Sequence, residues 1–318
     1  MIEGIPRISV RVITYKQEKL IKRALDSLLA QKDYIYEICV SDDCSPDGTW
    51  EVLKEYAEAN PGLFVLNRNE KNLGIFANIE KTWDMASGDM VFSIAGDDEA
   101  GSGWLKSVVE YVISNNIDYR NEFVTIYGDY EARYPNGDSF VFSNSAILSG
   151  IDPLRLSIRG IIGNRSAVCS KKVIKSFVKV SQGKSHIAES AIDRQLPLFS
   201  KKVYYIPWIG NIYYARIGVS ASIQGNTRKE RENIETYAMQ MMRDNGYDVT
   251  KEDAAYMQLR DEKGRSYRNK SISHYFKILK LHLASFDPKV SFKAFRLKRY
   301  VFALRLRLPH SKPFRMNV

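Results

Sequence analysis

The sequence predicts an α/β fold, in which a doubly wound parallel sheet is followed by an α+β half and a basic helical segment. Over the first hundred residues, short apolar runs alternate with stretches of helical periodicity, which is the pattern of parallel βαβ units. Beyond Glu99 the pattern changes to strands joined by turns. The end of the chain combines helical periodicity with many Lys and Arg residues. These observations predict three consecutive regions.

The first half begins with a strand and a helix. Residues 8–14 are predicted as a buried strand because five of the seven are β-branched. A helix is predicted from about residue 18 to residue 31, where apolar residues recur at helical spacing. Further strands are predicted over 36–40, 64–67 and 90–95, and further helices over 49–60 and 75–86.

The second half mixes both types of element. Its helices are predicted over 104–113 and within 168–180, and its strands over 123–127, 139–142 and 203–206. Trp104 opens the first of these helices, and its apolar neighbours Leu105 and Val108 favour packing in the core. This half is therefore predicted to elaborate the sheet of the first half.

Charge is distributed unevenly along the chain. The formal net charge is +10, but residues 263–318 contain 15 Lys or Arg and one acid, Asp287, which is a net of +14. The preceding 262 residues therefore carry a net charge of −4. Basic charge thus marks the tail, and the body of the protein lacks the basic character of a nucleic-acid-binding domain.

Composition predicts a protein of the reducing cytoplasm. Cys39, Cys44 and Cys169 have no metal-like spacing, and their odd number argues against a disulfide framework. Residues 1–9 contain no apolar signal-peptide core, and no window approaches the roughly 20 apolar residues that span a bilayer. With 318 residues, 44% of them apolar, the chain can bury a full core.

Two acidic clusters follow predicted strands. Residues 41–49 follow the strand at 36–40, and residues 96–99 follow the strand at 90–95. Ligands of open α/β sheets bind outside the carboxyl ends of the strands, so we expect both clusters to face one crevice. Paired aspartates supply the hard oxygen ligands of Mg²⁺ or Mn²⁺, which complete their shells with substrate phosphates and water. This combination indicates an enzyme acting on a nucleotide diphosphate.

Four sequence segments occur in an order typical of one enzyme family. They are Ile8–Tyr15 with Ala24–Gln31, Asp42–Thr49, Asn72–Gly74 with Asn78, and Gly96–Asp98 with Trp104–Leu105. Through residue 105 the sequence therefore resembles the family 2 glycosyltransferases, which are inverting enzymes of the Rossmann-like GT-A fold that use nucleotide-sugar donors. The resemblance implies a donor-nucleotide half over 1–105 and an acceptor half over 106–260, which together form a catalytic domain.

The resemblance implies roles for residues of the donor site. Tyr15 would stack on the base, and Asp43 would accept a hydrogen bond from a uracil or thymine N–H, because a carboxylate only accepts. Asp97 would hold the ribose hydroxyls. The implied donor-binding residues are Thr14, Tyr15, Asp43, Asn72, Gly74 and Asp97.

The residue that the resemblance implies as metal ligand is Asp98, which would bind Mn²⁺ or Mg²⁺ on the diphosphate. Two positions depart from the family pattern: Ile13 replaces a common proline, and Ala95 replaces the first aspartate of an Asp-x-Asp-Asp run. With fewer carboxylates, the ion must rely more on phosphate oxygens and water.

Several of these residues also have purely structural interpretations. Tyr15 fits ordinary packing at a strand end, and Asn72 with Gly74 fits a simple turn. Asp97 and Asp98 fit a polar loop. Asp47 precedes Gly48-Thr49, so it is expected to cap the following helix.

The general base is expected in residues 186–196, where the family carries a Glu-Asp pair before an apolar helix. Here Ser190 occupies the second place of that pair, and serine cannot serve as the base without a partner. Glu189 and Asp193 are four residues apart, so they share a helix face. Glu189 is the first candidate for the catalytic base and Asp193 the second. The alternative is an acidic surface pair, or an ion pair between Glu189 and Arg194.

The segment 261–318 is predicted as a basic amphipathic appendage. Six apolar residues lie on one helical face, namely Ile272, Tyr275, Phe276, Leu279, Leu283 and Phe286. Residues 289–318 then combine aromatic residues with nine Lys or Arg and no acid. Such segments bind anionic lipid surfaces. Packing on the catalytic domain and nucleic-acid binding are the alternatives, but no nucleic-acid motif accompanies the tail.

The sequence therefore predicts an inverting, metal-dependent glycosyltransferase at the inner face of the cell membrane. Its donor is expected to be a UDP- or dTDP-sugar, and its acceptor a lipid-linked saccharide of a bacterial surface polysaccharide. The alternative is an inactive nucleotide-sugar or membrane-surface binding protein of the same fold, which Ala95 and Ser190 favour. A nucleotidyltransferase is disfavoured, because residues 13–17 are not the Gly-rich basic phosphate loop that such enzymes usually need.

Overall fold

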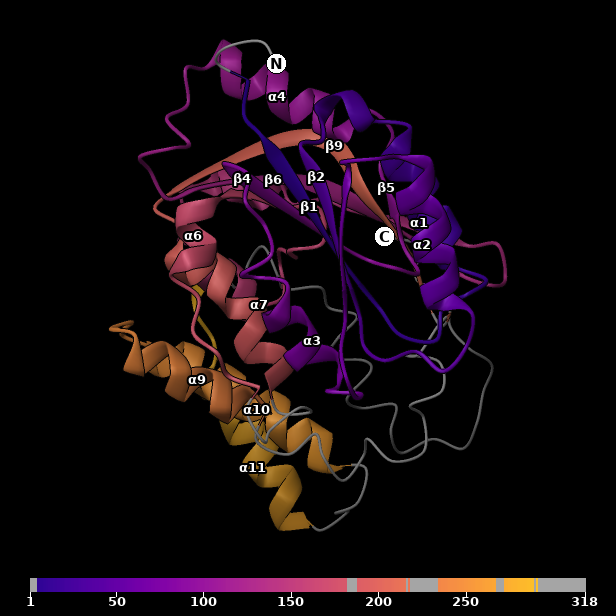
Figure 1. The fold of residues 1–318 in the computed structure, drawn as a ribbon. Coiled ribbons are helices and arrows are strands. Elements are labelled where there is room, and N and C mark those ends of the chain that lie inside the picture. Colours follow the sequence, from indigo (N-terminus) through magenta and orange to yellow (C-terminus); the bar gives the residue numbers. More distant parts are fainter. Residues whose placement is uncertain are drawn as a thin grey trace.

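The computed structural model describes residues 5–181, 188–215, 217, 234–266, 272–288 and 290. A nine-stranded sheet forms the centre of the molecule (Figure 1). Its strands are β1 (Ile8–Thr14), β2 (Glu37–Asp42), β3 (Phe64–Arg68), β4 (Met90–Ala95), β5 (Glu99–Ala100), β6 (Val124–Arg133), β7 (Ser139–Phe142), β8 (Val168–Ser170) and β9 (Lys202–Tyr214). They follow the order β3-β2-β1-β4-β8-β6-β9-β5, with β7 paired to β6.

The first four strands form the parallel, doubly wound half that the sequence predicts. β2 and β4 both pair in parallel with β1, and β3 pairs in parallel with β2. The chain therefore adds strands on one side of β1 and then crosses to its other side with β4. This reversal is a topological switch point, where the carboxyl ends of neighbouring strands leave a crevice for ligands.

Helices cover both faces of the sheet. On one face, α1 (Ile21–Leu29), α2 (Thr49–Ala59) and α4 (Trp104–Ser114) pack on alternate strand residues such as Ile38 and Val40. On the other face, α3 (Ile75–Lys81), α5 (Pro153–Ile158), α6 (Lys171–Lys175) and α7 (Ala188–Phe199) contact the intervening residues, including Cys39 and Val91. Strands buried on both faces read as nearly continuous apolar runs, as in β4.

A further layer of helices packs outside α5 and α7. It contains α9 (Ile234–Asp244), α10 (Lys251–Ser266) and α11 (Ile272–Ala284), which lie together below α7 in Figure 1. The Arg155 Nε lies 2.7 Å from the Asp253 carboxylate on α10, and the same guanidinium pairs with Asp287. The Arg159 side chain donates to the Ser285 carbonyl at 2.7 Å. The chain through Asp287 is thus tied to α5 by buried and half-buried arginines.

The predicted α/β class is confirmed. Some elements, such as β5, α5 and α9, were not predicted, and several predicted elements have different ends. The predicted helix over 75–86 ends at Lys81, where the Thr82 hydroxyl donates to the Ile79 carbonyl. The predicted strand over 203–206 continues to Tyr214, because a register shift against β6 lets the chain pass Pro207 and remain in the sheet. Helix α10 runs across residue 260, so no element boundary lies at that position. Residues 291–318 lie outside the described part of the chain.

Candidate active site

The carboxyl ends of β1, β2 and β4 meet at the switch point. The Asp43 N–H donates to the Thr14 carbonyl at 3.0 Å, and the Gly96 N–H donates to the Ile13 carbonyl at 2.9 Å. A Cβ on Gly96 would lie 2.4 Å from the Gln17 Oε1 atom, so a larger residue there would displace the Gln17 side chain. Both predicted acidic clusters therefore start within one hydrogen bond of the end of β1.

Asp43 organises the turn that precedes α3. Its carboxylate accepts hydrogen bonds from the Leu73 and Gly74 N–H groups at 2.8 and 2.9 Å and from the Asn69 amide at 2.9 Å. Gly74 has a φ of 86°, which favours glycine. The Asn72 amide lies 3.4 Å from the Asp43 carbonyl. The structure thus brings Asp43, Asn72 and Gly74 together, and a carboxylate with about four acceptor sites still has room for one more donor.

The other two carboxylates of the first cluster shape the loop, as expected. Asp42 is fully buried, accepts from the Ser45 N–H at 3.1 Å, and lies 3.4 Å from the Arg68 Nε atom. Asp47 accepts from the Thr49 N–H at 3.3 Å and from its hydroxyl at 2.6 Å, at the first residue of α2. Asp47 therefore binds the start of this helix, as expected, although the N-cap residue itself is Gly48.

Thr14 and Tyr15 lie at the carboxyl end of β1. Thr14 is buried, and its hydroxyl has no hydrogen-bond partner among the described residues. The next residue, Tyr15, is half-buried, and the Lys16 ammonium lies 5.1 Å from the centre of its ring. Lys16 and Cys44 have φ values of 55° and 58°. Strained backbone of this kind is concentrated at binding sites, and here it flanks the crevice on two neighbouring loops.

Asp97 and Asp98 follow β4 directly. Asp98 is 2% exposed, and burial raises its pKa to about 7, while the Arg165 charge opposes this increase. Burial also raises the pKa of the half-buried Asp97. An isolated buried carboxylate is unfavourable when ionised, so a cation at Asp98 would stabilise its charged form.

Two arginines partner this acidic cluster. The Arg165 Nη1 atom lies 3.4 Å from the Asp98 Oδ2 atom, and the Arg23 Nε atom lies 3.3 Å from the Glu99 Oε1 atom. Arg23 also donates to the Asp97 carbonyl. The cluster is therefore electrostatically compensated by side chains from α1 and from the loop before β8.

Asp98 fits a metal site with a single carboxylate ligand. Its oxygens are hard donors at the switch point, which suits Mn²⁺ or Mg²⁺. Within the described ranges, no group of three His, Cys, Asp or Glu side chains could form a protein cage for an ion. A divalent ion at Asp98 would accordingly take most of its ligands from a diphosphate and water.

The predicted base segment contacts the loop that carries Arg165. The Asn164 amide donates to the Asp193 carbonyl, and the next residue, Arg165, reaches Asp98. Asp193 is exposed. Burial raises the pKa of Tyr130, the Arg165 charge opposes this increase, and the Asp193 charge adds to it. Helix α7 thus places Asp193 on the side of Asp98.

In the rest of the base segment, Ser190 makes a structural contact, and the Glu189 side chain lies outside the described part of the chain. Ser190 is buried, and its hydroxyl donates to the Glu235 Oε2 atom at 2.9 Å. Arg194 lies 3.7 Å from the same oxygen atom, so Glu235 is a carboxylate partner of Arg194 among the described side chains. Glu189 belongs to α7, but its side chain and residues 182–187, including His186, lie outside the described part of the chain.

Tyr214 joins the site although the sequence patterns did not single it out. Its N–H donates to the Asp98 Oδ1 atom at 3.2 Å, and its hydroxyl donates to the Glu99 Oε1 atom at 2.6 Å. The Arg23 guanidinium lies 3.5 Å above its ring. β9 delivers Tyr214 because it pairs with β5, so the sequence signal is the position of the residue at the end of a long strand.

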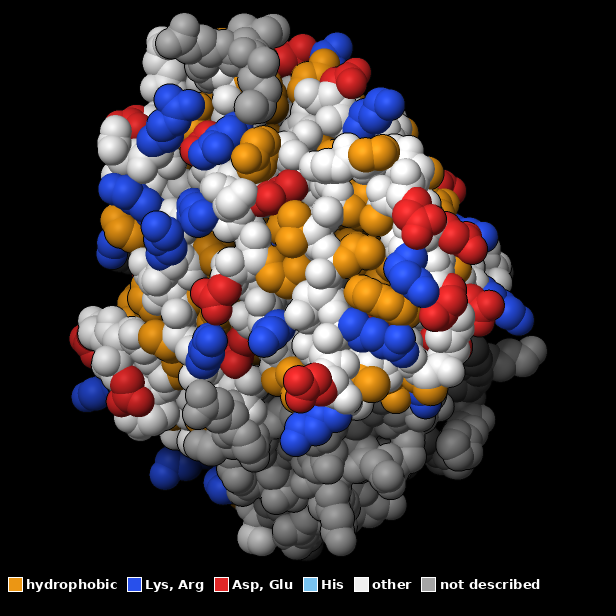
Figure 2. Space-filling model, viewed as in Figure 1, with side chains coloured by type: hydrophobic (Ala, Val, Ile, Leu, Met, Phe, Trp, Pro, Cys, Tyr) orange, Lys and Arg blue, Asp and Glu red, His pale blue; other side chains and the backbone are white. Residues whose placement is uncertain are grey.

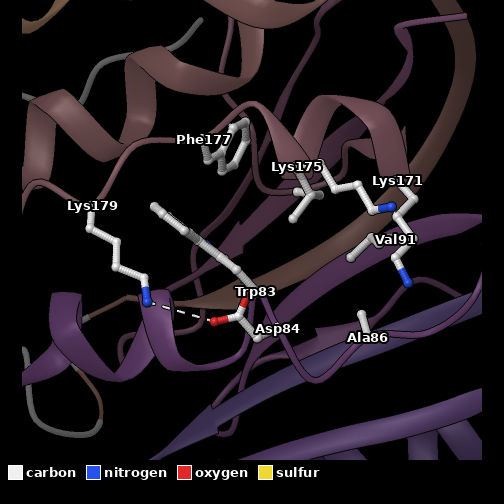
Figure 3. A pocket seen from close by; sticks show the side chains of 9 residues that line it. Trp83, Asp84, Ala86, Val91, Lys171, Lys175, Phe177 and Lys179 are labelled. Atoms are coloured by element: carbon white, nitrogen blue, oxygen red, sulfur yellow. Dashed lines mark ion pairs between the residues drawn. The ribbon is translucent and has the colours of Figure 1, made fainter.

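A separate pocket lies at the other end of β4. About 170 Å³ in volume, it is lined by Trp83, Asp84, Ala86, Val91, Lys171, Ile174, Lys175, Phe177 and Lys179 (Figure 3). The Lys179 ammonium pairs with Asp84 at 3.6 Å. Figure 2 shows basic side chains gathered on this side of the molecule, near α6, and mixed charges over α1 and α2. None of the predicted site residues lines this pocket.

Comparisons with known proteins show a related family and related sequences. The model of glycosyl transferase family 2 matches residues 9–167. The GalNAc(5)-diNAcBac-PP-undecaprenol β-1,3-glucosyltransferase of Campylobacter jejuni is 34% identical over 106 residues, which is 33% of this chain and 34% of that protein. The matches span between 27% and 43% of the length of these curated relatives.

Solved structures share the fold. TarS 1–349 of S. aureus in complex with UDP-GlcNAc has a TM-score of 0.57 at 16% identity, over 86% of this chain and 79% of that chain. The mannosyltransferase PcManGT of Pyrobaculum calidifontis, in complex with GDP-Man and Mn²⁺, has a TM-score of 0.51 at 16% identity, over 96% of this chain and 87% of that chain. At these identities the likeness concerns the fold.

Proposed function

The chain belongs to glycosyl transferase family 2, and we propose that it transfers a sugar from a UDP- or dTDP-sugar to a saccharide acceptor with inversion at the anomeric carbon. The observation that carries this proposal is the meeting of Asp43, Asp97 and Asp98 at the switch point between β1 and β4. The TarS structure that contains UDP-GlcNAc shares this fold and supports a nucleotide-sugar donor.

The donor nucleotide would occupy the crevice above β1. Asp43 is held by two backbone N–H groups, so its remaining acceptor site is fixed in direction and suits the N–H of a uracil or thymine ring. Tyr15, at the carboxyl end of β1, would stack on the base. The partly exposed Asp97 carboxylate is the acceptor for the ribose hydroxyls.

A divalent cation would be held by Asp98 at the diphosphate. When bound, Mn²⁺ or Mg²⁺ neutralises the charge that builds on the leaving diphosphate. The Mn²⁺ in the PcManGT complex, which has the same fold, supports this assignment. The protein contributes one buried carboxylate, whose other oxygen is oriented by the Tyr214 N–H at 3.2 Å.

The transfer itself needs one general base. As the acceptor hydroxyl oxygen attacks the anomeric carbon, its proton passes to a carboxylate and the bond between that carbon and the diphosphate oxygen breaks. Asp193 is supported by its exposure and by the link through Asn164 to Arg165 and Asp98. Glu189 lies one helical turn earlier and is the alternative base.

The acceptor is proposed to be lipid-linked, in the assembly of a bacterial surface polysaccharide at the inner face of the membrane. The Campylobacter relative is named as a glucosyltransferase that acts on GalNAc(5)-diNAcBac-PP-undecaprenol, which is a lipid-linked saccharide. Four apolar residues of α11 and the turn after it are exposed, at 47% to 67%: Phe276, Leu279, Leu283 and Phe286. Within the described residues, no helix is long and apolar enough to cross a bilayer, so contact through an exposed apolar face suits this role.

Thermal unfolding with a panel of donors tests the proposal. The panel contains UDP-glucose, UDP-galactose, their N-acetyl forms and dTDP-rhamnose, each with and without Mn²⁺. We expect one donor to raise the melting temperature when Mn²⁺ is present, because ligands that bind only the folded state stabilise it. Nucleoside diphosphate release is then measured with that donor. Stabilisation without release would support a binding protein, and stabilisation by no donor would refute the proposal.

A further inference from the structure

The carboxylate proposed to hold a cation already has a cationic partner within the chain. The Arg165 Nη1 atom lies 3.4 Å from the Asp98 Oδ2 atom, and the Arg165 guanidinium lies 3.7 Å above the Tyr213 ring. Its side chain is 42% exposed, whereas that of Asp98 is 3% exposed. The arginine therefore covers the buried carboxylate from the solvent side, where a diphosphate would approach.

The loop that carries Arg165 is held on both sides. The Gly163 N–H donates to the Asn144 side chain at 2.9 Å, and the Asn144 amide donates back to the Gly163 carbonyl at 3.0 Å. On the other side, the Ser166 hydroxyl donates to the Gly128 carbonyl. The backbone around Arg165 is thus held on both sides, while its side chain is 42% exposed.

The positive charge of Arg165 affects whether a divalent ion can bind Asp98. In the structure, Glu99 pairs with Arg23 and Asp98 pairs with Arg165. A divalent ion bound to Asp98 would face the Arg165 charge at close range, and like charges at this distance repel. Binding of the ion therefore requires the guanidinium to leave Asp98. Guanidinium groups form paired hydrogen bonds with phosphate oxygens, so the diphosphate that arrives with the ion is a suitable new partner.

We propose that Arg165 competes with the divalent ion for Asp98 in the empty enzyme and moves to the donor diphosphate when donor and ion bind. This inference rests on the proposed function. In this proposal, Arg165 binds the leaving diphosphate, and it opposes binding of the divalent ion to Asp98 before the donor is present. Its charge would oppose loss of the nucleoside diphosphate until the transfer is complete.

Metal binding without donor tests the first half of the proposal. Free Mn²⁺ is titrated with wild type, Arg165→Gln and Arg165→Lys and measured by electron paramagnetic resonance. Loss of a half-exposed ion pair corresponds to up to roughly fivefold tighter Mn²⁺ binding in Arg165→Gln. Arg165→Lys keeps the charge, so its Mn²⁺ affinity should match that of wild type. Unchanged affinity in Arg165→Gln would overturn the competition, whether or not the protein transfers sugar.

Binding of UDP with saturating Mn²⁺ tests the second half. Loss of a charge-assisted hydrogen bond predicts about 10- to 100-fold weaker UDP binding in Arg165→Gln, and an intermediate loss in Arg165→Lys, which lacks the planar fork. Arg120→Ala is the control, because Arg120 is a half-exposed arginine that pairs with Asp89 at the other end of β4. Equal UDP affinity in wild type and Arg165→Gln would overturn the proposed diphosphate contact. Failure of the proposed function alone would appear as absence of sugar transfer by wild type.

Discussion

At the scale of single residues, Asp98 shows how burial and charge oppose each other in this site. Burial raises its pKa to about 7, whereas the Arg165 guanidinium lowers it. A carboxyl whose folded pKa exceeds its unfolded value stabilises the folded state at low pH, and this stabilisation is lost as the pH rises through the folded pKa. Burial of Asp98 therefore destabilises the folded protein by an amount that grows between about pH 4 and pH 7 and is largest above pH 7.

The variant Asp98→Asn should be more stable than wild type at pH 8, and the difference should be smaller at pH 5. The amide removes the cost of ionisation, for which the shifted pKa sets an upper bound of about 4 kcal/mol. Urea unfolding without metal at both pH values measures it. Asp118→Asn is the control, since Asp118 is exposed and the Asn121 N–H lowers its pKa. A stability difference for Asp98→Asn that is equal at both pH values would contradict this account.

The base can be assigned by comparing two substitutions on α7. Asp193→Asn should lower kcat by about 100-fold or more with little change in the KM for the donor, because the residue acts on the acceptor proton. Glu189→Gln should retain most of the activity. Steady-state kinetics with varied donor separates these effects. The opposite pattern would assign the proton transfer to Glu189.

The sequence places Asp43, Asp97 and Asp98 near the ends of predicted strands, but it does not indicate their basic partners. Asp43, Asp97 and Asp98 directly follow apolar strands, so their position could be inferred from local pattern alone. Arg165 reaches Asp98 from 67 residues away, and Tyr214 from 116 residues away. Such contacts depend on how β8 and β9 join the sheet, and no local periodicity encodes that.

At the scale of secondary structure elements, the same distinction explains which boundaries were predicted. The strands Ile8–Thr14 and Met90–Ala95 have the predicted bounds, because β-branched and apolar runs end at polar loops there. β9 is much longer than predicted, since Pro207 normally interrupts a strand and only the register shift opposite β6 accommodates it. The length of β9 is therefore set by its pairing with β6 and not by its local sequence.

Helix α7 is positioned by a buried carboxylate on α9. Glu235 is 4% exposed, accepts from the Ser190 hydroxyl at 2.9 Å, and pairs with Arg194 at 3.7 Å and Arg260 at 2.9 Å. Serine at position 190 thus supports a structural contact between α7 and α9. This contact fixes the helix that carries both base candidates.

Replacement Glu235→Ala should destabilise the protein by about 3–5 kcal/mol, because it leaves the buried Arg194 without its carboxylate. Urea unfolding provides the measurement, and Glu58→Ala on the exposed side of α2 is the matched control. If the Glu235 variant unfolded at the same urea concentration as the control, the network would not anchor α7.

At the scale of the whole molecule, α11 presents an apolar face that the described fold leaves open. Phe276 and Leu283 are 67% and 66% exposed, although α11 is tied to α10 by the ion pair of Lys277 with Glu262 at 2.6 Å. Residues 291–318, which carry most of the predicted basic charge after α11, lie outside the described residues. The prediction that this end of the chain meets an anionic membrane stays open to direct test.

The double variant Phe276→Ser/Leu283→Ser should bind phosphatidylglycerol vesicles roughly tenfold more weakly or worse than wild type. Each large apolar side chain contributes about 1.5–3 kcal/mol when it leaves water. Vesicle sedimentation measures binding, with phosphatidylcholine vesicles as the uncharged comparison. Leu148→Ser is the control, since Leu148 is 72% exposed on the short helix Ser145–Ser149, elsewhere in the molecule. Equal loss in both variants, or no loss, would exclude α11 as the docking face.

The central claim is that Asp98 at the switch point supports transfer from a nucleotide sugar. The most direct test is Mn²⁺-dependent release of nucleoside diphosphate, measured with the stabilising donor and a membrane extract as the source of acceptor. Wild type should release it, and Asp98→Asn should lower the rate by at least about 100-fold, because the leaving group loses its cation. A rate in Asp98→Asn that equals that of wild type would contradict the account.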